Sequence, residues 1–380
     1  ARLLGGRLFA DGRPGSFSGR ASGEAASAVP LGERWTLFPT VSAAWSGVES
    51  ALDVPGGTTL FQESLLSRVR VKAVLRPEAS RWSWKAWTGW RGELLKETKD
   101  ESWFHGLFDN HTVDVGLEAE RTARGGARAS FSYAFSRTLF PNYSSLESSA
   151  PSDPYGRPLA RELAGVRVLD WDGHLFSAGL SVPLPHGLDA SARGGLQLRD
   201  YLEQHLVQSD GLLGPGTRSD VVGLLSAGLG ASGEVWPDAR AGGGLDVSFE
   251  DDVSDQASFD PASGRYEPHH YDYTQWSVGP RASLSYGDPR APLRLSLAAA
   301  ASLRRWPHRS ARDASGLFTG AGLTESDWSV SAEGRWPLAP GLSLVGRVER
   351  TWARANDHDE ALHRFNYDAT SVLAGVALER

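Results

Sequence analysis

The chain of 380 residues contains no cysteine and no methionine. Without cysteine it can form no disulfide, no thiolate nucleophile and no cysteine-ligated metal site. A translated chain begins with methionine, so we expect that an original N-terminus was removed before Ala1, by cleavage of a secretory signal peptide or by other trimming. The lack of cysteine suits an oxidising envelope compartment.

Long apolar runs are also missing. No run reaches the ~18 residues that identify a membrane-spanning helix. The chain is 40% hydrophobic, with a mean hydropathy of -0.33. These values exclude helical membrane spans but not a transmembrane β-barrel, because only every second residue of a barrel strand faces lipid.

Alternation of apolar and polar residues is the dominant pattern. In the segment 326–338, one parity carries Trp328, Val330, Ala332, Gly334, Trp336 and Leu338. The opposite parity carries Asp327, Ser329, Ser331, Glu333 and Arg335. Segment 293–303 alternates in the same way, and both segments are long enough for the ~9 to 11 residues that a tilted strand needs to cross a bilayer. The pattern predicts an all-β transmembrane barrel; a soluble β-sandwich or solenoid is the alternative.

Short turns alternate with longer polar connections along the whole chain. Proline and glycine clusters predict turns near 30–32, 77–80, 122–126, 183–187, 236–238, 287–292 and 337–341. The longer connections lie near 47–63, 96–109, 140–172, 202–217, 251–272, 307–325 and 355–364. We therefore predict a single-domain, up-and-down antiparallel barrel over residues 1–380. It has about sixteen strands, with fourteen to eighteen possible, short periplasmic turns, long extracellular loops and both termini in the periplasm.

Tryptophans near the predicted strand ends are typical of interfacial girdles. They are Trp35, Trp82, Trp84, Trp236, Trp306, Trp328, Trp336 and Trp352. Trp87 falls on the inward parity, so we predict that it faces the lumen.

The same parity rule predicts the lining of the lumen. The predicted inward cations, which form the candidate substrate path, are Arg68, Arg70, Lys72, Arg81, Lys85, Arg91, Arg128, Arg193, Arg199, Arg281, Arg294, Arg304, Arg335 and Arg347. The predicted inward acids are Asp114, Glu118, Glu120, Asp246, Glu250, Glu333 and Glu349. Since the net charge is -7, we expect acidity to concentrate in the outer loops, at Asp251, Asp252, Asp255, Asp260, Asp357, Asp359 and Glu360.

A basic lumen beneath acidic loops predicts a preference for anionic solutes. The alternative is that arginine and glutamate pair across neighbouring strands and only stiffen the wall.

Motifs for other chemistry lack their structural context. Gly228, Gly230 and Gly233 spell GxGxxG inside a predicted strand, which excludes a dinucleotide-binding turn. His358, Glu360 and His363 lack the cysteines that a deaminase zinc site requires. Other histidines near the outer rim cannot be matched to a nucleophile by spacing. We expect no enzymatic activity, no cofactor, no metal and no nucleic-acid partner.

The final strand, 365–380, resembles the C-terminal strand of Gram-negative outer-membrane barrels, although it ends on Arg380 and not on an aromatic residue. The C-terminal third also resembles, more weakly, barrels associated with polysaccharide export. The residues that carry this resemblance are Arg304, Arg305, Trp306, Arg309, Arg312, Asp313, Phe318, Thr319, Trp352, Asn356, Phe365, Asn366, Tyr367 and Asp368. The resemblance implies a carbohydrate cargo and an inner-envelope, periplasm-facing export partner.

The predicted loops distinguish a conduit from a typical porin. The third loop, 96–109, is short, whereas the fourth, 140–172, is the longest and contains Pro141, Pro151, Pro154 and Pro158. We predict that the fourth loop acts as a lid. The sequence thus favours an integral outer-membrane conduit for hydrophilic, carbohydrate cargo, surrounded by lipid and lipopolysaccharide. A passive anion-preferring porin and a plugged structural or adhesive barrel are the alternatives.

Overall fold

The computed structural model describes residues 1–10, 13–50, 60–78, 80–96, 100–144, 161–260, 263–289, 291–359 and 366–379. One 17-stranded antiparallel sheet closes on itself, because β1 pairs with both β2 and β19. Sixteen of its strands form the wall, and the short β3 continues β2 along β4. The predicted sixteen-stranded up-and-down barrel is confirmed.

The strand bounds follow the chain in order around the barrel. The first half comprises β1 Arg2–Ala10, β2 Arg13–Ala26, β3 Val29–Leu31, β4 Trp35–Ser50, β5 Leu60–Leu75, β6 Trp82–Lys96, β7 Asn110–Thr122, β8 Arg128–Leu139 and β9 Trp171–Pro183. The second half comprises β10 Leu188–Val207, β11 Leu213–Trp236, β12 Ala239–Ser254, β15 Tyr273–Tyr286, β16 Leu293–Arg312, β17 Phe318–Ala339, β18 Leu342–Ala355 and β19 Tyr367–Leu378. A small hairpin, β13 Ser258–Asp260 with β14 Arg265–Glu267, stands apart from the wall.

Two single-turn 3₁₀ helices, η1 Arg161–Leu163 and η2 Pro185–Gly187, complete the described elements. None of the described residues forms a helix long and apolar enough to span a membrane.

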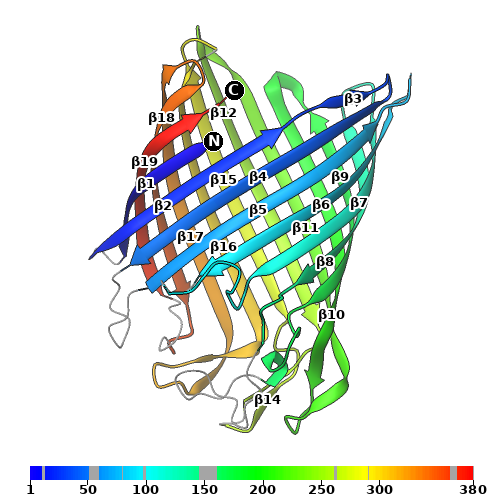
Figure 1. Cartoon of the computed structure of the whole chain (residues 1–380), viewed down its shortest axis with the longest axis vertical. Coiled ribbons are helices and arrows are strands. Elements are labelled where there is room, and N and C mark those ends of the chain that lie inside the picture. The colour runs from blue at the N-terminus through cyan, green and yellow to red at the C-terminus, as the bar shows by residue number, and fades with distance from the viewer. Residues whose placement is uncertain are drawn as a thin grey trace.

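The two ends of the barrel differ (Figure 1). Both termini and the short turns lie at the upper end of the view, whereas β14 and the described parts of the longer connections lie at the lower end. Each of the seven predicted short turns lies where two consecutive wall strands meet, although β3 overlaps the turn 30–32 and β17 continues to Ala339 in the turn 337–341. In the β17–β18 turn, Gly341 has φ +78°, a conformation that glycine adopts without a steric penalty. We call the end with the short turns the inner end and the end with the long connections the outer end.

The hairpins at the outer end are longer than the sequence predicted. The predicted loops 202–217 and 307–325 are wrong for most of their length, because β10–β11 and β16–β17 continue through them. Strands β4 and β5 likewise extend into the predicted loop 47–63. At the outer end, beyond the lipid, both faces of a strand meet water. Polar residues on both faces there do not indicate a loop.

Large apolar side chains cover the outside of the wall. Leu297 is 59% exposed and Trp336 is 61% exposed, as expected of residues that meet lipid instead of water. Most of the predicted girdle tryptophans are exposed on this side. Trp306 is the exception: it is 8% exposed and contacts Tyr273 on the inner parity, so its assignment to the girdle was wrong.

Candidate functional site

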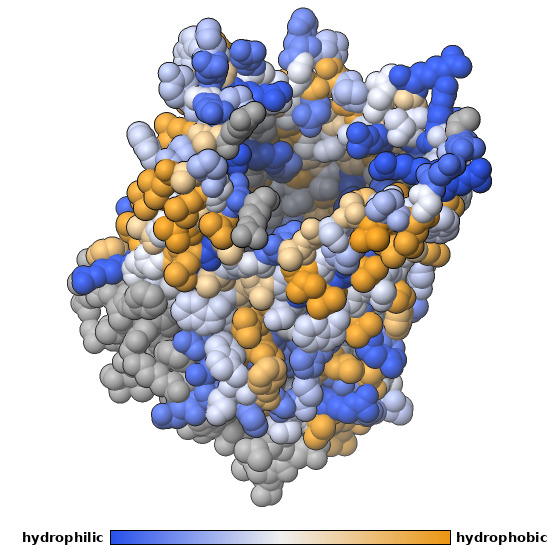
Figure 2. Space-filling model, turned by 45° about the horizontal axis from the view of Figure 1, so that its top comes forward, coloured by the Kyte–Doolittle hydropathy of each residue, from blue (hydrophilic) through white to orange (hydrophobic). Residues whose placement is uncertain are grey.

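The polar face of the wall is its concave face. Arg2 on β1 pairs with Glu333 on β17, across the two intervening strands β18 and β19. In the same way, Nη1 of Arg20 on β2 lies 3.6 Å from Oε2 of Glu349 on β18. Side chains converge in this way only inside a closed sheet. Figure 2 agrees, since hydrophilic residues line the hollow at the inner end and hydrophobic residues gather on the wall outside it.

The predicted cations share the parity of these inner residues, with one exception. Arg81 lies in the turn just before β6 and not on a strand. Many of the others have acidic partners. The pairs are Lys85 with Glu118 and Glu120, Arg91 with Glu93, Arg199 with Asp252, Arg281 with Asp246, Arg294 with Glu379, Arg335 with Glu333 and Glu379, and Arg347 with Glu333 and Glu349.

The wall therefore carries more acid than the sequence analysis predicted. Glu93, Asp220 and Asp252 were not counted among the inward acids, and Asp252 was assigned to an outer loop. The inward cations Arg2 and Arg20 were also missed. Asp220 and Asp252 lie in the outer extensions of β11 and β12, just beyond the apolar belt, where the alternation that reveals parity fades.

Strand β5 is different, because its three inward cations have no ion-pair partner among the described residues. We call Arg68, Arg70 and Lys72 the β5 strip. Alternate residues of a strand are ~6.5 Å apart, so the strip presents three positive charges in a row along the wall. Arg68 and Arg70 are exposed, and Lys72 is half-buried.

Aromatic rings accompany the β5 strip. The Arg70 guanidinium carbon lies 5.1 Å from the centre of the Trp87 ring on β6, and the Lys72 ammonium lies 5.7 Å from the centre of the Phe38 ring on β4. The Trp87 ring lies directly over Gly116 of β7, where a Cβ atom would collide with it. A glycine at this position lets the indole lie along the wall. Trp87 therefore lies on the inner face, as predicted.

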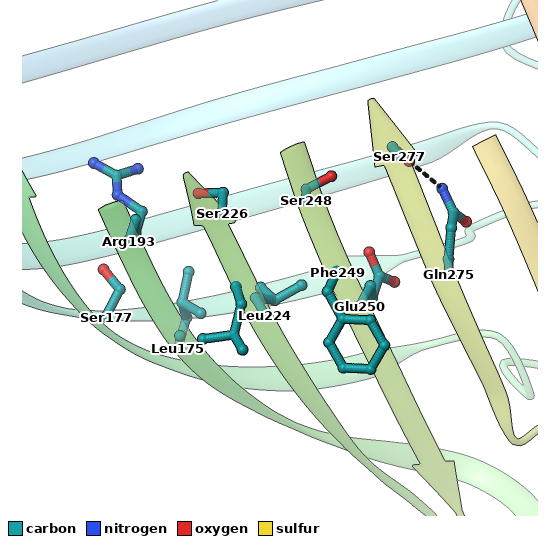
Figure 3. Close-up of a pocket in the computed structure, with 12 residues that line it drawn as sticks. Leu175, Ser177, Arg193, Leu224, Ser226, Ser248, Phe249, Glu250, Gln275 and Ser277 are labelled. Carbon is teal, nitrogen blue, oxygen red and sulfur yellow. Dashed lines mark hydrogen bonds between the residues drawn. The ribbon is translucent and has the colours of Figure 1, made fainter. Parts of the chain in front are cut away.

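A shallow hollow lies on the inner wall between β9 and β15 (Figure 3). Its inner-parity lining combines small hydroxyl side chains with one cation, Arg193, one acid, Glu250, and the side chains of Gln275, Leu175 and Leu224. In the close-up, Arg193, Ser226, Ser248 and Gln275 come from successive strands, and the Gln275 amide donates a hydrogen bond of 3.3 Å to Ser277. Arg193 is exposed and has no ion pair among the described residues. This part of the wall offers hydrogen-bond donors and acceptors without a dense charge.

The outer mouth contains a buried polar cluster. The Arg218 guanidinium donates two hydrogen bonds to Asp220, of 2.8 and 2.7 Å. It lies between the Tyr201 and Tyr271 rings, whose centres are 4.5 and 4.1 Å from its carbon. Asp220 is completely buried. Burial raises the pKa of Tyr271 well above its usual range, and the adjacent Glu162 carboxylate adds to this effect.

The fourth loop contributes to this cluster through its described ends. Glu162 of η1 accepts a hydrogen bond of 3.0 Å from the Tyr271 hydroxyl, and its backbone carbonyl accepts one of 3.2 Å from the Gln204 side chain. Tyr143 donates a 2.7 Å hydrogen bond to the carbonyl of Leu163. The loop thus packs across the outer ends of β10 and β11. Residues 145–160, which include three of its four prolines, lie outside the described residues.

Histidines at the outer rim have structural partners. His174 on β9 lies 2.9 Å from the Tyr133 hydroxyl, and His270 lies 2.8 Å from Glu267. In the part of the chain that the structure describes, no group of three metal-ligating side chains converges.

No family model and no curated protein sequence matches the chain. Solved structures do match it. A bacterial polysaccharide outer membrane secretin is 10% identical, with 100% of this chain and 97% of that chain covered and a TM-score of 0.45. OccD3 (OpdP) from Pseudomonas aeruginosa is 9% identical, with 100% and 91% covered and a TM-score of 0.45. The beta domain of the Bordetella autotransporter BrkA is 9% identical, with 92% and 100% covered and a TM-score of 0.35.

These likenesses are too distant to carry any argument, so the fold assignment depends on the chain's own strands. The closed antiparallel sheet, the apolar outer belt and the charged concave face together are the features of a transmembrane barrel. The chain has the fold of an outer-membrane β-barrel.

Proposed function

We propose that the chain is an outer-membrane conduit for hydrophilic cargo and that this cargo is an anionic carbohydrate. The observation that carries the proposal is the β5 strip, where Arg68, Arg70 and Lys72 lack acidic partners among the described residues and lie beside aromatic rings. Pore-lining charge that is not neutralised by a neighbour attracts ions of the opposite sign. The strip would therefore hold the acidic groups of a passing chain.

Carbohydrate suits the wall better than a simple inorganic anion. A sugar ring presents hydroxyls to hydrogen-bonding side chains and a flat C–H face to aromatic rings. The wall supplies both, through the Trp87 ring beside the β5 strip and through the hydroxyls of Ser226 and Ser248 in the shallow hollow. Export of a carbohydrate from the periplasm to the outside would require a periplasmic partner. This partner would meet the barrel at its inner end.

Planar-bilayer recording of the purified, refolded chain tests this function. We expect an anion-selective current that uronic-acid oligosaccharides block at lower concentrations than neutral oligosaccharides of equal length. Equal block by the two kinds of oligosaccharide would refute the anionic cargo. A barrel that is folded, as shown by heat-modifiable migration, but passes no current in the bilayer would argue against a conduit that is open without a partner.

A passive porin is the second candidate. The hydrophilic hollow visible at the inner end favours it, because small solutes need only a wet, open path (Figure 2). The same recording separates the two functions. A steady anion-selective current without block by any oligosaccharide would favour the porin.

A further inference from the structure

Two arginines of β18 face the lipid and not the lumen. Arg350 and Arg354 share the parity of Leu344 and Val348, which are exposed on the outside of the wall. The opposite parity holds Val345, which is completely buried. Both arginines are more than half exposed, and both lie in the half of β18 that approaches the outer end.

Lipid-facing arginine requires an explanation. A cation on the lipid face of a barrel is costly at the middle of the bilayer and nearly free at its interfaces. Arg350 lies opposite Val330 of β17. This position is two residues closer to the inner end than the paired Trp328 and Trp352. A long arginine side chain at this depth can extend its guanidinium to the headgroups of the outer leaflet.

The acid on this surface does not balance the arginines. Asp368 on β19 is the carboxylate that both contact, with its oxygens 2.6 Å from Nη2 of Arg354 and 3.8 Å from Nη2 of Arg350. Two cations thus share one anion. Arg305, at the outer end of β16, faces the same side, is exposed and has no ion pair among the described residues. We call Arg305, Arg350 and Arg354 the outer-leaflet cations.

The Trp352 ring positions one of the outer-leaflet cations, Arg350. The Arg350 guanidinium carbon lies 5.0 Å from the centre of the Trp352 ring, which holds the cation beside the wall. In contrast, Arg137 on β8, which also faces outward at the outer end, forms a bidentate one-to-one pair with Asp172, with bonds of 2.7 and 2.6 Å. Arg137 is thus neutralised by its own partner, whereas the outward arginines of β16 and β18 outnumber their acidic partners among the described residues.

We propose that the outer-leaflet cations form a binding site for a membrane lipid with a phosphorylated headgroup. Guanidinium groups bind phosphate oxygens with short, charge-assisted hydrogen bonds. The acyl chains of the same lipid would pack against the exposed apolar belt below, at Val330 and Val348. This site lies on the outside of the wall and does not depend on what passes through the lumen.

Native mass spectrometry of the full chain in detergent tests the site. The protein is incubated with equal amounts of diphosphorylated lipid A and of lipid A from which the phosphates have been removed. We expect about tenfold preferential retention of the phosphorylated lipid. An equal concentration of inorganic phosphate should not displace it, because free phosphate lacks the acyl chains; displacement would mean a simple anion site and would overturn the proposal.

Variants locate the effect. The double variant Arg350→Gln/Arg354→Gln should lose the preference, while Arg350→Lys/Arg354→Lys, which keeps the charges, should retain most of it. The matched control Arg137→Gln/Asp172→Asn removes a neutralised outward pair and should bind like the unmodified chain. Heat-modifiable migration establishes that each variant is folded. Equal retention of both lipids by the unmodified chain, or unchanged preference in the glutamine variant, would overturn the proposal.

Discussion

Arg70 on β5 and Arg218 on β11 are both arginines stacked on aromatic rings, yet their surroundings are opposite. Arg70 is exposed beside Trp87 and has no acidic partner among the described residues. Arg218 is buried between two tyrosines and bonded twice to Asp220. The first guanidinium can bind something that enters the lumen. The second is already bonded to Asp220 and stacked on two tyrosines, so its role is to stabilise the outer mouth.

The difference shows that the number of arginines on a pore wall does not measure its affinity for anions. A paired arginine contributes a dipole, whereas an unneutralised one contributes a field that reaches the pore axis. On β17 and β18 the cations Arg335 and Arg347 are divided among Glu333, Glu349 and Glu379. We therefore propose that the β5 strip determines anion selectivity and that the paired arginines hold the wall strands together.

The largest expected effect comes from replacing Arg218, the buried arginine that is bonded twice to Asp220. Arg218→Gln leaves Asp220 buried without its cation, and the loss of one partner of a buried pair costs about 3–5 kcal/mol. We expect the outer mouth to open locally while the wall remains closed. Hydrogen–deuterium exchange should rise around residues 161–170 and 199–207 but not in β5.

The control for this variant is Arg137→Gln. It breaks an ion pair of similar geometry at the exposed outer rim, where such pairs contribute little. Exchange around the outer mouth should remain unchanged in the control. Equal protection of the outer mouth in both variants would contradict the assignment of Arg218 as a closing residue.

A smaller effect should come from removing the acidic partner of cations on β1, β17 and β18. Glu333 contacts Arg2, Arg335 and Arg347, so Glu333→Gln deprives all three of one partner. The anion preference, measured as the reversal potential in a salt gradient, should increase. Glu78→Gln removes the same charge from a short turn outside the wall and should have little effect. An unchanged reversal potential in Glu333→Gln would mean that wall pairing does not control selectivity.

The smallest expected effect is a pH dependence of the outer hairpin. Burial acts to raise the pKa of Glu267, but hydrogen bonds from His270 and the Ser310 amide outweigh it, so the pKa lies below its ordinary value. A lowered carboxyl pKa stabilises the folded state above the unfolded-state pKa, and this contribution is lost as the pH falls through the folded-state pKa. Acidification should therefore loosen β13–β14.

Comparison with Glu267→Gln isolates this contribution. At each pH, hydrogen–deuterium exchange in residues 258–267 is compared between the unmodified chain and the variant, so that the intrinsic exchange rate cancels. The variant should exchange faster than the unmodified chain near neutral pH, and the difference should vanish in acid. A difference that persists in acid would show that Glu267 does not titrate as described.

The sequence predicted the wall better than the ends of its strands. Alternation identified β16 and β17 because lipid on one side and water on the other force a period of two on every residue between them. Beyond the lipid this force disappears, so the outer parts of β10, β11, β16 and β17 were taken for loops. The buried Asp252 lies in the outer part of β12, within the predicted loop 251–272, and the buried Asp220 lies in β11 next to the predicted loop 202–217. For this reason neither was identified from the sequence as an inward acid.

Parity also cannot show which charges meet. The residues Arg20 and Glu349 are far apart in sequence and on strands separated by β1 and β19, and only barrel closure brings them within 3.6 Å. The sequence therefore indicated cations on the inner face but not which of them stay free. Pairing depends on the register and curvature of several strands at once.

The most direct test of the account compares two variants of the lumen wall in the planar bilayer. Arg68→Gln/Arg70→Gln/Lys72→Gln removes the β5 strip, whereas the matched control Asp246→Asn/Arg281→Gln removes a cation together with its own partner. Reversal potential and block by a uronic-acid oligosaccharide are recorded for both. We predict that the strip variant loses its anion preference and binds the oligosaccharide about tenfold more weakly, as expected for the loss of roughly 1.4 kcal/mol, while the control matches the unmodified chain. Unchanged selectivity in the strip variant, or an equal loss in the control, would contradict the account.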